Sequence, residues 1–186
     1  MIGYAFTGSF CTLSRSLTEL RGLVGQGFDV LPIMSENVYS TDTRFFAAAD
    51  FRAEVESVCG REIIHTIKDA EPLGPKSPLD YLIIAPCTGN TLAKIANGIT
   101  DTAVTMAAKA HLRCDRGMLV ALASNDAMSQ NLGNIAKLLP RKSVYFVPLS
   151  QDDPVGKPHS LVADFSKLGE AFSAMQKGRQ IRPLFT

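Results

Sequence analysis

Short apolar runs alternate along this chain with segments in which apolar residues recur every three or four positions. Each run is short enough to form a strand that is buried on both faces. The predicted strands are residues 2–6, 28–34, 81–85, 119–123 and 144–147. The predicted helices are residues 13–25, 44–58, 91–96 continuing through 103–112, 126–138 and 164–176. This alternation predicts an α/β fold around a parallel sheet with right-handed crossovers.

Two segments interrupt the alternation. Residues 62–79 hold Pro72, Gly74, Pro75 and Pro78, which prevent a regular helix, so an ordered loop is predicted, with room for a short strand at 62–64. Residues 150–164 also have the composition of a loop that leads into the last helix. Without a repeat, a low-complexity tract or a linker, the chain is predicted to be a single domain over residues 1–186.

Composition narrows the class of protein. The 186 residues, 46% of them hydrophobic, suit one globular domain with a substantial core. A net charge of +1, without a basic and aromatic cluster, argues against nucleic acid as a partner. The start "MIGYAFTGSF" lacks the features of a signal peptide, and no apolar run is long enough for a membrane span, so a cytoplasmic location is predicted. The four cysteines are scattered without metal-ligand spacing, which predicts free thiols and no metal site.

Small polar residues follow three of the predicted strands. Gly8 and Ser9 follow the first strand, and Ser35 follows the second. The third strand leads into a polar helix start, and its candidate residues are Pro86, Cys87, Thr88, Gly89, Asn90 and Thr91. Because the carboxyl ends of parallel strands share one edge, these residues are predicted to form a crevice for a phosphate-bearing or dicarboxylate ligand. Pro86 is predicted to stop the third strand.

The same residues also have plain structural interpretations. Thr12 or Ser14 is suited to cap the first helix, and Thr41, Asp42 or Thr43 is suited to cap the next one. The segment from Gly3 to Gly8 has the wrong glycine spacing for a dinucleotide fingerprint, and no acidic residue closes the following strand. Nicotinamide binding is therefore not assigned to this chain.

The stretch "IIAPCTGNTLAKIANGITD" and the Thr7-Gly8-Ser9 turn carry a family resemblance. They resemble the Pro-Ala-Ser/Thr-Ala-Asn-Thr motif and first flavin-contacting loop of the flavoprotein family, the homo-oligomeric flavin-containing cysteine decarboxylases. The resemblance implies a Rossmann-like three-layer sandwich, FMN as a cofactor of this chain, and homo-oligomers such as trimers or dodecamers. The catalytic His and the substrate-clamping Pro-x-Met-Asn-x-x-Met segment of those decarboxylases are poorly matched here, so cysteine decarboxylation is disfavoured.

Three further stretches, "AEPLGPKSPLDYLIIAPCTGNT", "ITDTAVTMAAKAHLR" and "YFVPLSQDDPVGKPHSLVAD", resemble one branch of the family, the dipicolinate synthase B subunits. That resemblance implies an oxidoreductase subunit that acts on a dicarboxylate substrate. It implies a dehydrogenase-like A subunit with NADP as partner, and synthesis of pyridine-2,6-dicarboxylate in the mother cell of a sporulating bacterium. An FMN-dependent decarboxylase, a flavin prenyltransferase-like enzyme and a non-catalytic scaffold for the A subunit stay open as alternatives.

The implied chemistry needs groups that bind carboxylates and groups that move protons. Asn90 and His159 are the predicted catalytic residues, Asn90 in the motif and His159 in the loop with two aspartates. His65 and His111 are the other histidines that are able to act as acid or base near neutral pH. Candidate carboxylate ligands are Lys76, Lys94, Arg113 and Lys157.

Overall fold

A computed structural model of the chain describes residues 1–74, 76 and 79–186, and its centre is one seven-stranded sheet. The strands are β1 (Ile2–Phe6), β2 (Val30–Met34), β3 (Tyr81–Cys87), β4 (Met118–Ser124), β5 (Val144–Phe146), β6 (Leu149–Ser150) and β7 (Leu161–Ala163). Their order is β2-β1-β3-β4-β7-β6, and β5 also pairs with β4. Strands β1 to β5 pair in parallel, which confirms the predicted α/β class.

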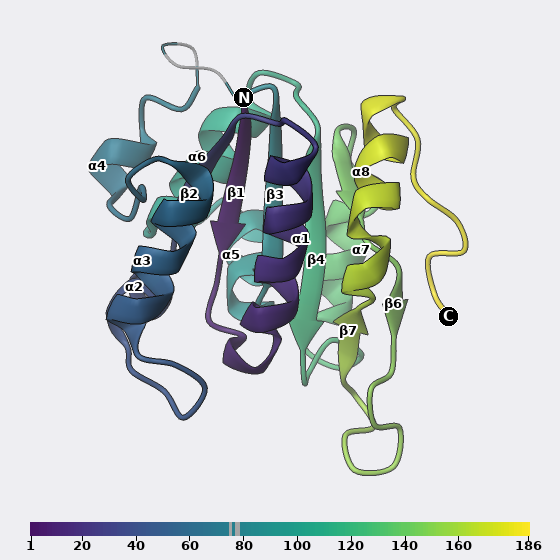
Figure 1. Cartoon of the computed structure of the whole chain (residues 1–186). Helices are drawn as coiled ribbons and strands as arrows, with labels where there is room; N and C mark the ends of the chain where they lie inside the picture. Colours follow the sequence, from purple (N-terminus) through teal and green to yellow (C-terminus); the bar gives the residue numbers. More distant parts are fainter. Residues whose placement is uncertain (75, 77–78) are drawn as a thin grey trace.

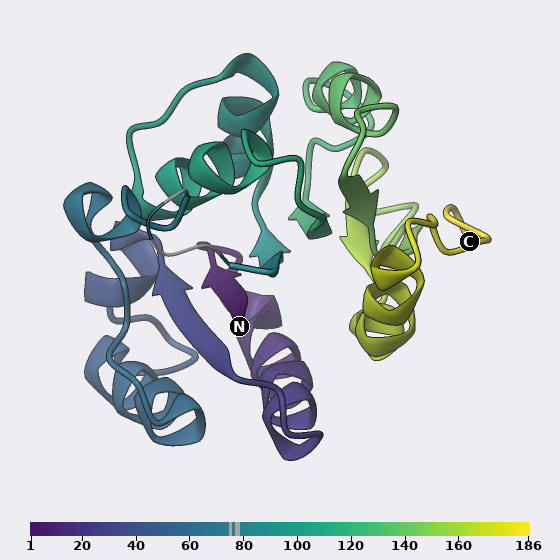
Figure 2. The same cartoon turned by 90° about the horizontal axis from the view of Figure 1, so that it is seen from above.

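Helices cover both faces of this sheet, as Figures 1 and 2 show. The helices are α1 (Leu13–Gly25), α2 (Glu36–Ser40), α3 (Ala48–Cys59), α4 (Ile67–Ala70), α5 (Gly89–Asn97), α6 (Ala103–Leu112), α7 (Leu132–Leu138) and α8 (Leu168–Gln176), with 3-10 turns at Phe10–Thr12 and Phe165–Lys167. The first face carries α1, α3 and α8, and the opposite face carries α5, α6 and α7 (Figures 1 and 2). The result is a three-layer sandwich.

The hydrophobic pattern explains why the layers adhere. All five residues of β1 are buried, as expected of a strand with helices on both sides. On α1 the buried leucines at positions 13, 17, 20 and 23 recur at helical spacing and form one apolar stripe against the sheet. Gly60 and Gly98 end α3 and α5 in the left-handed region, at φ 62° and 74°, which a residue with a side chain rarely adopts.

One edge of the sheet differs from the prediction. Residues 150–164 were expected to be a loop, but β6 and β7 flank a shorter loop and pair with each other in antiparallel fashion. The reason is that β5 pairs only with the first half of β4, at residues 118–120, so the second half of β4 is left free on that side. Strand β7 then pairs antiparallel with Ala123 and Ser124 in the second half. The loop from Gln151 to Ser160 projects beyond the sheet at the lower edge of Figure 1.

Several predicted helix boundaries were wrong. The helix predicted over 91–96 and 103–112 is two helices, because Gly98 ends α5 and Thr102 caps α6. Residues 126–131 form turns, so α7 begins only at Leu132. Helix α3 begins at Ala48, and its N-cap residue is Ala47 rather than one of the predicted residues Thr41, Asp42 and Thr43. The Ala48 N–H still donates to Asp42 at 2.8 Å, so Asp42 satisfies one N–H group of the first turn from outside the N-cap position.

Short elements within the predicted loops were missed. Helix α2 follows β2 directly, and α4 lies within residues 62–79. Pro75 and Pro78 of that segment lie outside the described residues. The short strand expected at 62–64 is reduced to one parallel bridge between Ile64 and Ile33. Neither Thr12 nor Ser14 caps α1 with its side chain, because the Thr12 hydroxyl donates to the Ser9 carbonyl instead.

Removing the Tyr4 hydroxyl is expected to destabilise the fold. Tyr4 is fully buried, and its hydroxyl lies 2.9 Å from both the carbonyl oxygen and the hydroxyl of Ser16. The Ser16 hydroxyl donates in turn to the Ala85 carbonyl. Tyr4→Phe is expected to lower the free energy of unfolding by about 1–2 kcal/mol in urea denaturation. Tyr145→Phe is the matched control, because the partly buried Tyr145 makes no side-chain hydrogen bond to the described residues. Equal losses in the two variants would contradict this role for the hydroxyl.

Candidate functional site

The ends of β1 and β3 are joined by Thr7, which is 1% exposed. Its backbone N–H and its hydroxyl both donate to the Pro86 carbonyl, at 3.2 and 2.8 Å. The same hydroxyl accepts from the Thr88 N–H at 2.8 Å. Pro86 therefore does not stop β3 as predicted, since the strand runs to Cys87 with a shift in register against β4.

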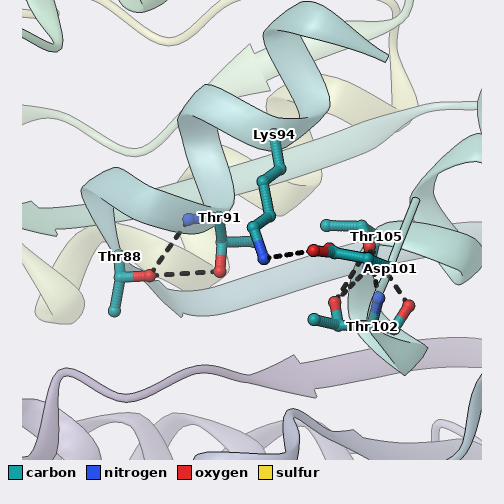
Figure 3. Close-up of polar contacts among 6 residues, drawn as sticks. All are labelled: Thr88, Thr91, Lys94, Asp101, Thr102 and Thr105. Carbon is teal, nitrogen blue, oxygen red and sulfur yellow. Dashed lines mark hydrogen bonds and ion pairs between the residues drawn. The ribbon is translucent and has the colours of Figure 1, made fainter. Parts of the chain in front are cut away.

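Helix α5 begins directly after this junction. The Thr88 hydroxyl accepts from the Thr91 N–H at 3.2 Å, which caps the helix (Figure 3). One turn further, Lys94 extends to Asp101 just before α6, with 2.8 Å between Nζ and the carboxylate (Figure 3). The Lys94 ammonium lowers the pKa of Asp101 below its ordinary value. The start of α6 is fixed by a reciprocal capping box between Thr102 and Thr105.

Two cavities meet at Gly8 and Thr88, on the carboxyl edge of the sheet. The first cavity has a volume of about 500 Å³ and the second about 360 Å³. The residues that line the first cavity include Ser9, Arg15, Arg44, Gly89, Ser124 and Lys157. The residues that line the second cavity include Ser35, Glu36, Asn90, Thr91, Lys94 and Asp101. Their combined size lies in the range of small-molecule sites.

Unpaired cations line the first cavity. Arg15 and Arg44 form no ion pair with the described residues, although the Arg44 guanidinium lies 4.9 Å from the centre of the Phe45 ring. Lys157 lies there too, but it is paired with Asp152 at 2.9 Å. The Ser160 hydroxyl, and after it the Lys157 ammonium, lowers the pKa of Asp152 below its ordinary value. Guanidinium groups without a carboxylate partner suit an anionic ligand.

A buried hydroxyl without a partner lines the second cavity. Ser35 follows β2, and its Oγ is buried without a hydrogen bond to the described residues. An unsatisfied buried hydroxyl costs about 1–3 kcal/mol, so a ligand atom that bonds to it would recover that free energy. Glu36, the next residue, is exposed on the same cavity and forms no ion pair within the described chain.

Gly89 lets a polar cluster approach the start of α5. A Cβ atom at Gly89 would lie 2.3 Å from Ser124 Oγ and 2.5 Å from Asn131 Nδ2. Both side chains donate to the Asp126 carboxylate, and together they lower its pKa, the Ser124 hydroxyl having the larger effect. A carboxylate at a helix N-terminus is itself favourable, so Asp126 stabilises α5 from this side.

The predicted cofactor-binding residues divide into four groups. Gly8 and Thr88 lie between the two cavities; Ser9 and Gly89 line the first; Ser35, Asn90 and Thr91 line the second. Pro86 and Cys87 are buried and line neither cavity, and burial raises the pKa of the Cys87 thiol. The three strand ends therefore converge as predicted. Which of these residues touch a ligand stays a prediction.

The three histidines have different environments. His159 is exposed and lines neither cavity, although its backbone carbonyl accepts from the Met128 N–H at 2.9 Å. His111 is 1% exposed and bonds to the Gly117 carbonyl, and burial lowers its pKa, as expected of a structural residue. His65 stacks on Tyr39 with ring centres 3.7 Å apart, and it lines a third cavity of about 320 Å³.

That third cavity adjoins the second, because Glu36, Asp101 and Thr102 line both. Of the basic residues predicted to bind carboxylates, Lys157 lines the first cavity and Lys94 lines the second. Arg113 instead lines a separate cavity of about 190 Å³ beside α6. Lys76 is exposed in a turn and lines none of the described cavities.

Sequence reasoning missed Arg15 and Arg44, which line the first cavity and form no ion pair with the described residues. Arg15 lies in the first turn of α1, where the "FTGSFCTLS" turn pointed, and Arg44 follows the polar "MSENVYSTDT" stretch. Each arginine directly follows one of these polar stretches, but the sequence carries no signal that it lacks a carboxylate partner.

Comparison with known proteins agrees with this geometry. A family model described as Flavoprotein matches residues 1–171. The chain belongs to the flavoprotein family. It is 41% identical to the B subunit of dipicolinate synthase from Bacillus subtilis (strain 168) over 183 residues, which cover 98% of this chain and 92% of that protein.

Solved structures share the fold of this chain. The B subunit of dipicolinate synthase from Bacillus halodurans C superposes with a TM-score of 0.91 at 39% identity, covering 100% of this chain and 95% of that one. A dodecameric FMN-dependent Ubix-like decarboxylase from Escherichia coli O157:H7 has a TM-score of 0.62 at 20% identity, with 79% of each chain covered. The second likeness extends to the fold alone.

Other classes of feature are absent from the described residues. No group of three or more His, Cys, Asp or Glu side chains there is placed to hold a metal ion. None of the helices in that part of the chain is long and apolar enough to cross a membrane. All four cysteines are free thiols, as predicted.

Ser124→Ala is expected to raise the pKa of Asp126 towards its ordinary value of 3.8, because it removes the stronger of the two donors. A carboxyl group with a depressed pKa stabilises the fold above the pKa of the unfolded chain, and this contribution is lost as the pH falls through the folded pKa. The variant should therefore lose less stability than the wild type on acidification below about pH 4.

Carbon-13 NMR titration of the Asp126 carboxyl group measures this shift directly. Ser129→Ala is the matched control, since the Ser129 hydroxyl donates to the Asp126 backbone carbonyl and not to the carboxylate. An unchanged Asp126 pKa in Ser124→Ala would show that this hydroxyl does not hold the carboxylate.

Proposed function

We propose that this chain is the flavoprotein-like subunit of a dipicolinate synthase and is active together with a dehydrogenase-like A subunit. The complex would convert a hydroxy-tetrahydro- or dihydrodipicolinate to pyridine-2,6-dicarboxylate during sporulation, in the cytoplasm of the mother cell. The observation that carries this proposal is 41% identity to the B subunit of a dipicolinate synthase over 98% of the chain. At 39% identity, the fold of a second such subunit also matches over the full chain.

The proposed reaction sets clear chemical demands. Loss of water from the hydroxylated ring gives the dihydro compound, and loss of a hydride and a proton then gives the aromatic ring. The hydride needs an acceptor, and β2 ends at Met34 rather than at the acidic residue of a nicotinamide site. We therefore assign the acceptor, NADP, to the partner subunit, and substrate binding and orientation to this chain.

Residues at the crevice suit that task. Arg15 and Arg44 are free to bind a carboxylate. Asn90 is exposed at the second cavity with a side-chain amide able to orient a ring edge, so it keeps its predicted catalytic role in this proposal. His159 is a weaker catalytic candidate, because its side chain would have to reach the ligand from outside both cavities.

The crevice also fits a flavin, which keeps an FMN-dependent decarboxylase or prenyltransferase-like activity as the second candidate. The helical segment that starts at Phe10 presents N–H groups without intrahelical partners beside Ser9 and Arg15, as a phosphate group requires. The unsatisfied Ser35 hydroxyl and the Asn90 amide would face a ring. Bound FMN would supply a hydride acceptor within this chain.

Assembly and catalysis are separable parts of the proposal. A homo-oligomer of this chain, a trimer or a dodecamer, is proposed because the related E. coli decarboxylase is dodecameric. A scaffold that only stabilises the A subunit would need the assembly but not the crevice. Substitutions in the crevice therefore distinguish a catalytic subunit from a scaffold.

Each subunit alone is expected to make no dipicolinate, and the two mixed are expected to make it with reduction of NADP. The reason is that one chain holds the substrate and the other holds the hydride acceptor. The absorbance of the pyridine product measures dipicolinate formation, and the absorbance of the reduced nicotinamide measures hydride transfer. Turnover by this chain alone with a yellow, FMN-bound sample would favour the flavin enzyme.

Light scattering of the same samples should report a homo-oligomer of this chain, and a strict monomer would contradict the proposed assembly.

Asn90→Ala is expected to lower kcat/KM of the mixed subunits by at least about tenfold, because it removes an amide that orients the ligand. Asn97→Ala is the matched control, being the same change at the other end of α5 and outside both cavities. Full activity of Asn90→Ala, with unchanged assembly, would favour the scaffold.

A further inference from the structure

A small cavity beside α6, called the α6 cavity below, is lined by aliphatic side chains. These side chains are Ile95, Ile99, Ala108 and Leu112. The volume of the cavity, about 190 Å³, is below the roughly 300–1,000 Å³ of small-molecule sites, so it suits an inserted side chain better than a whole ligand. Ile99 is 48% exposed, which leaves the aliphatic lining open to a partner.

Three cations surround the aliphatic lining of the α6 cavity. They are Lys109, Arg113 and Arg141. All three are exposed, and none of them forms an ion pair with the described residues. No described Asp or Glu lines this cavity. The α6 cavity therefore fits an apolar side chain that has a carboxylate beside it.

The loop from Gln151 to Ser160 presents a tip with this chemistry, formed by residues 153–156. Val155 at the tip is 93% exposed, more than any other large apolar side chain in the described part of the chain. The carboxylate of Asp153 accepts from the Gly156 N–H at 2.8 Å and has no ion-pair partner among the described residues. A Cβ at Gly156 would lie 2.3 Å from that carboxylate, so glycine lets the carboxylate lie against the tip.

Polar contacts within the loop hold it in shape. The Asp152 carboxylate accepts from the Ser160 hydroxyl at 2.6 Å and pairs with Lys157 at 2.9 Å. The Gln151 side-chain amide donates to the Pro158 carbonyl at 3.0 Å. A preformed tip loses little conformational entropy when it binds, which favours a docking role.

The loop tip and the α6 cavity do not meet within one chain. The loop projects beyond the lower edge of the sheet in Figure 1, where the parallel strands end. Helix α6 instead ends near the opposite edge, since Arg116 just beyond it donates to the Leu79 carbonyl before β3. A contact between tip and cavity therefore joins two copies through different surfaces, and such a contact closes a ring when the rotation between copies allows it.

We infer that the Val155 tip of one copy inserts into the α6 cavity of the next copy, with Asp153 beside the three cations. This inference rests on the homo-oligomer of the proposed function and assigns its interface. Asp152 and Lys157, in the same loop, line the first cavity. Each contact therefore brings a neighbouring copy to the rim of the crevice.

Substitutions on both surfaces test the interface. Val155→Asn and Ile99→Asn should each raise the concentration at which the homo-oligomer dissociates by at least about tenfold in light scattering, because each puts an amide into an apolar contact. Both side chains are exposed in the single chain, so circular dichroism should show an unchanged fold. Leu132→Asn is the matched control, because Leu132 is 51% exposed and lies outside both surfaces. Asp153→Asn keeps an oxygen for the Gly156 N–H and should weaken assembly by a smaller factor.

Mixing two variants tests that the contact uses different surfaces on each copy. The Val155→Asn copy keeps an intact cavity, and the Ile99→Asn copy keeps an intact tip. At a concentration where each variant alone has dissociated, an equal mixture should associate in pairs, since one of the two contacts is restored and the other is not. Variants that dissociate alone and stay apart when mixed would overturn the inference.

The assembly measurements are independent of dipicolinate synthesis. An oligomer that neither Val155→Asn nor Ile99→Asn weakens would overturn this interface and leave the proposed assembly standing, whereas a strict monomer would contradict both. Loss of binding to the A subunit, with an unchanged homo-oligomer, would assign the surfaces to that subunit and also overturn the inference. Synthesis by the mixed wild-type subunits tests the proposed reaction whichever assembly result is found.

Discussion

The site depends on the Thr7 hydroxyl, which holds the ends of β1 and β3 together. One oxygen atom donates to the Pro86 carbonyl and accepts from the Thr88 N–H, both at 2.8 Å, in a position closed to water. Such a two-way bond satisfies two backbone groups where the sheet ladder has already ended. Because Gly8 follows Thr7 and Thr88 caps α5, the same bond sets the separation of the two chain segments that divide the crevice.

The surroundings of α5 restrict where a ligand is able to bind. Asp126 and its donors already occupy the space beside Gly89, so a phosphate at that position would meet a carboxylate. Cationic side chains instead come from the starts of two other segments, Arg15 on α1 and Arg44 before α3. The start of α5 thus shapes the crevice, while the charge that attracts an anion is supplied by its neighbours.

Prediction from sequence succeeded where local patterns determine the structure. Residues 2–6 and 13–25 form the predicted strand and helix without any change of boundary, since strong apolar periodicity leaves no alternative. The strand β7 was missed because three residues of loop-like surroundings become a strand only by pairing with the free half of β4. In the site, the sequence predicted the turn at Gly8 and the helix start at Thr88, but it could not predict which charged side chains form ion pairs. In the sequence Arg15 resembles any exposed helical arginine, and only the tertiary structure shows that no carboxylate pairs with it among the described residues.

The two arginines of the first cavity also bear on how catalysis would be shared. In the proposed function Arg15 and Arg44 would hold a carboxylate of the ring, and such a contact would restrict the position of that ring. One face of the ring would then stay available to a second chain, because the crevice lies at the carboxyl edge of the sheet beside the loop from Gln151 to Ser160. A hydride acceptor held by a partner needs just such a fixed and accessible ring. Orientation in one subunit and oxidation in the other are thus physically consistent with a protein that has a flavoprotein fold and no nicotinamide fingerprint.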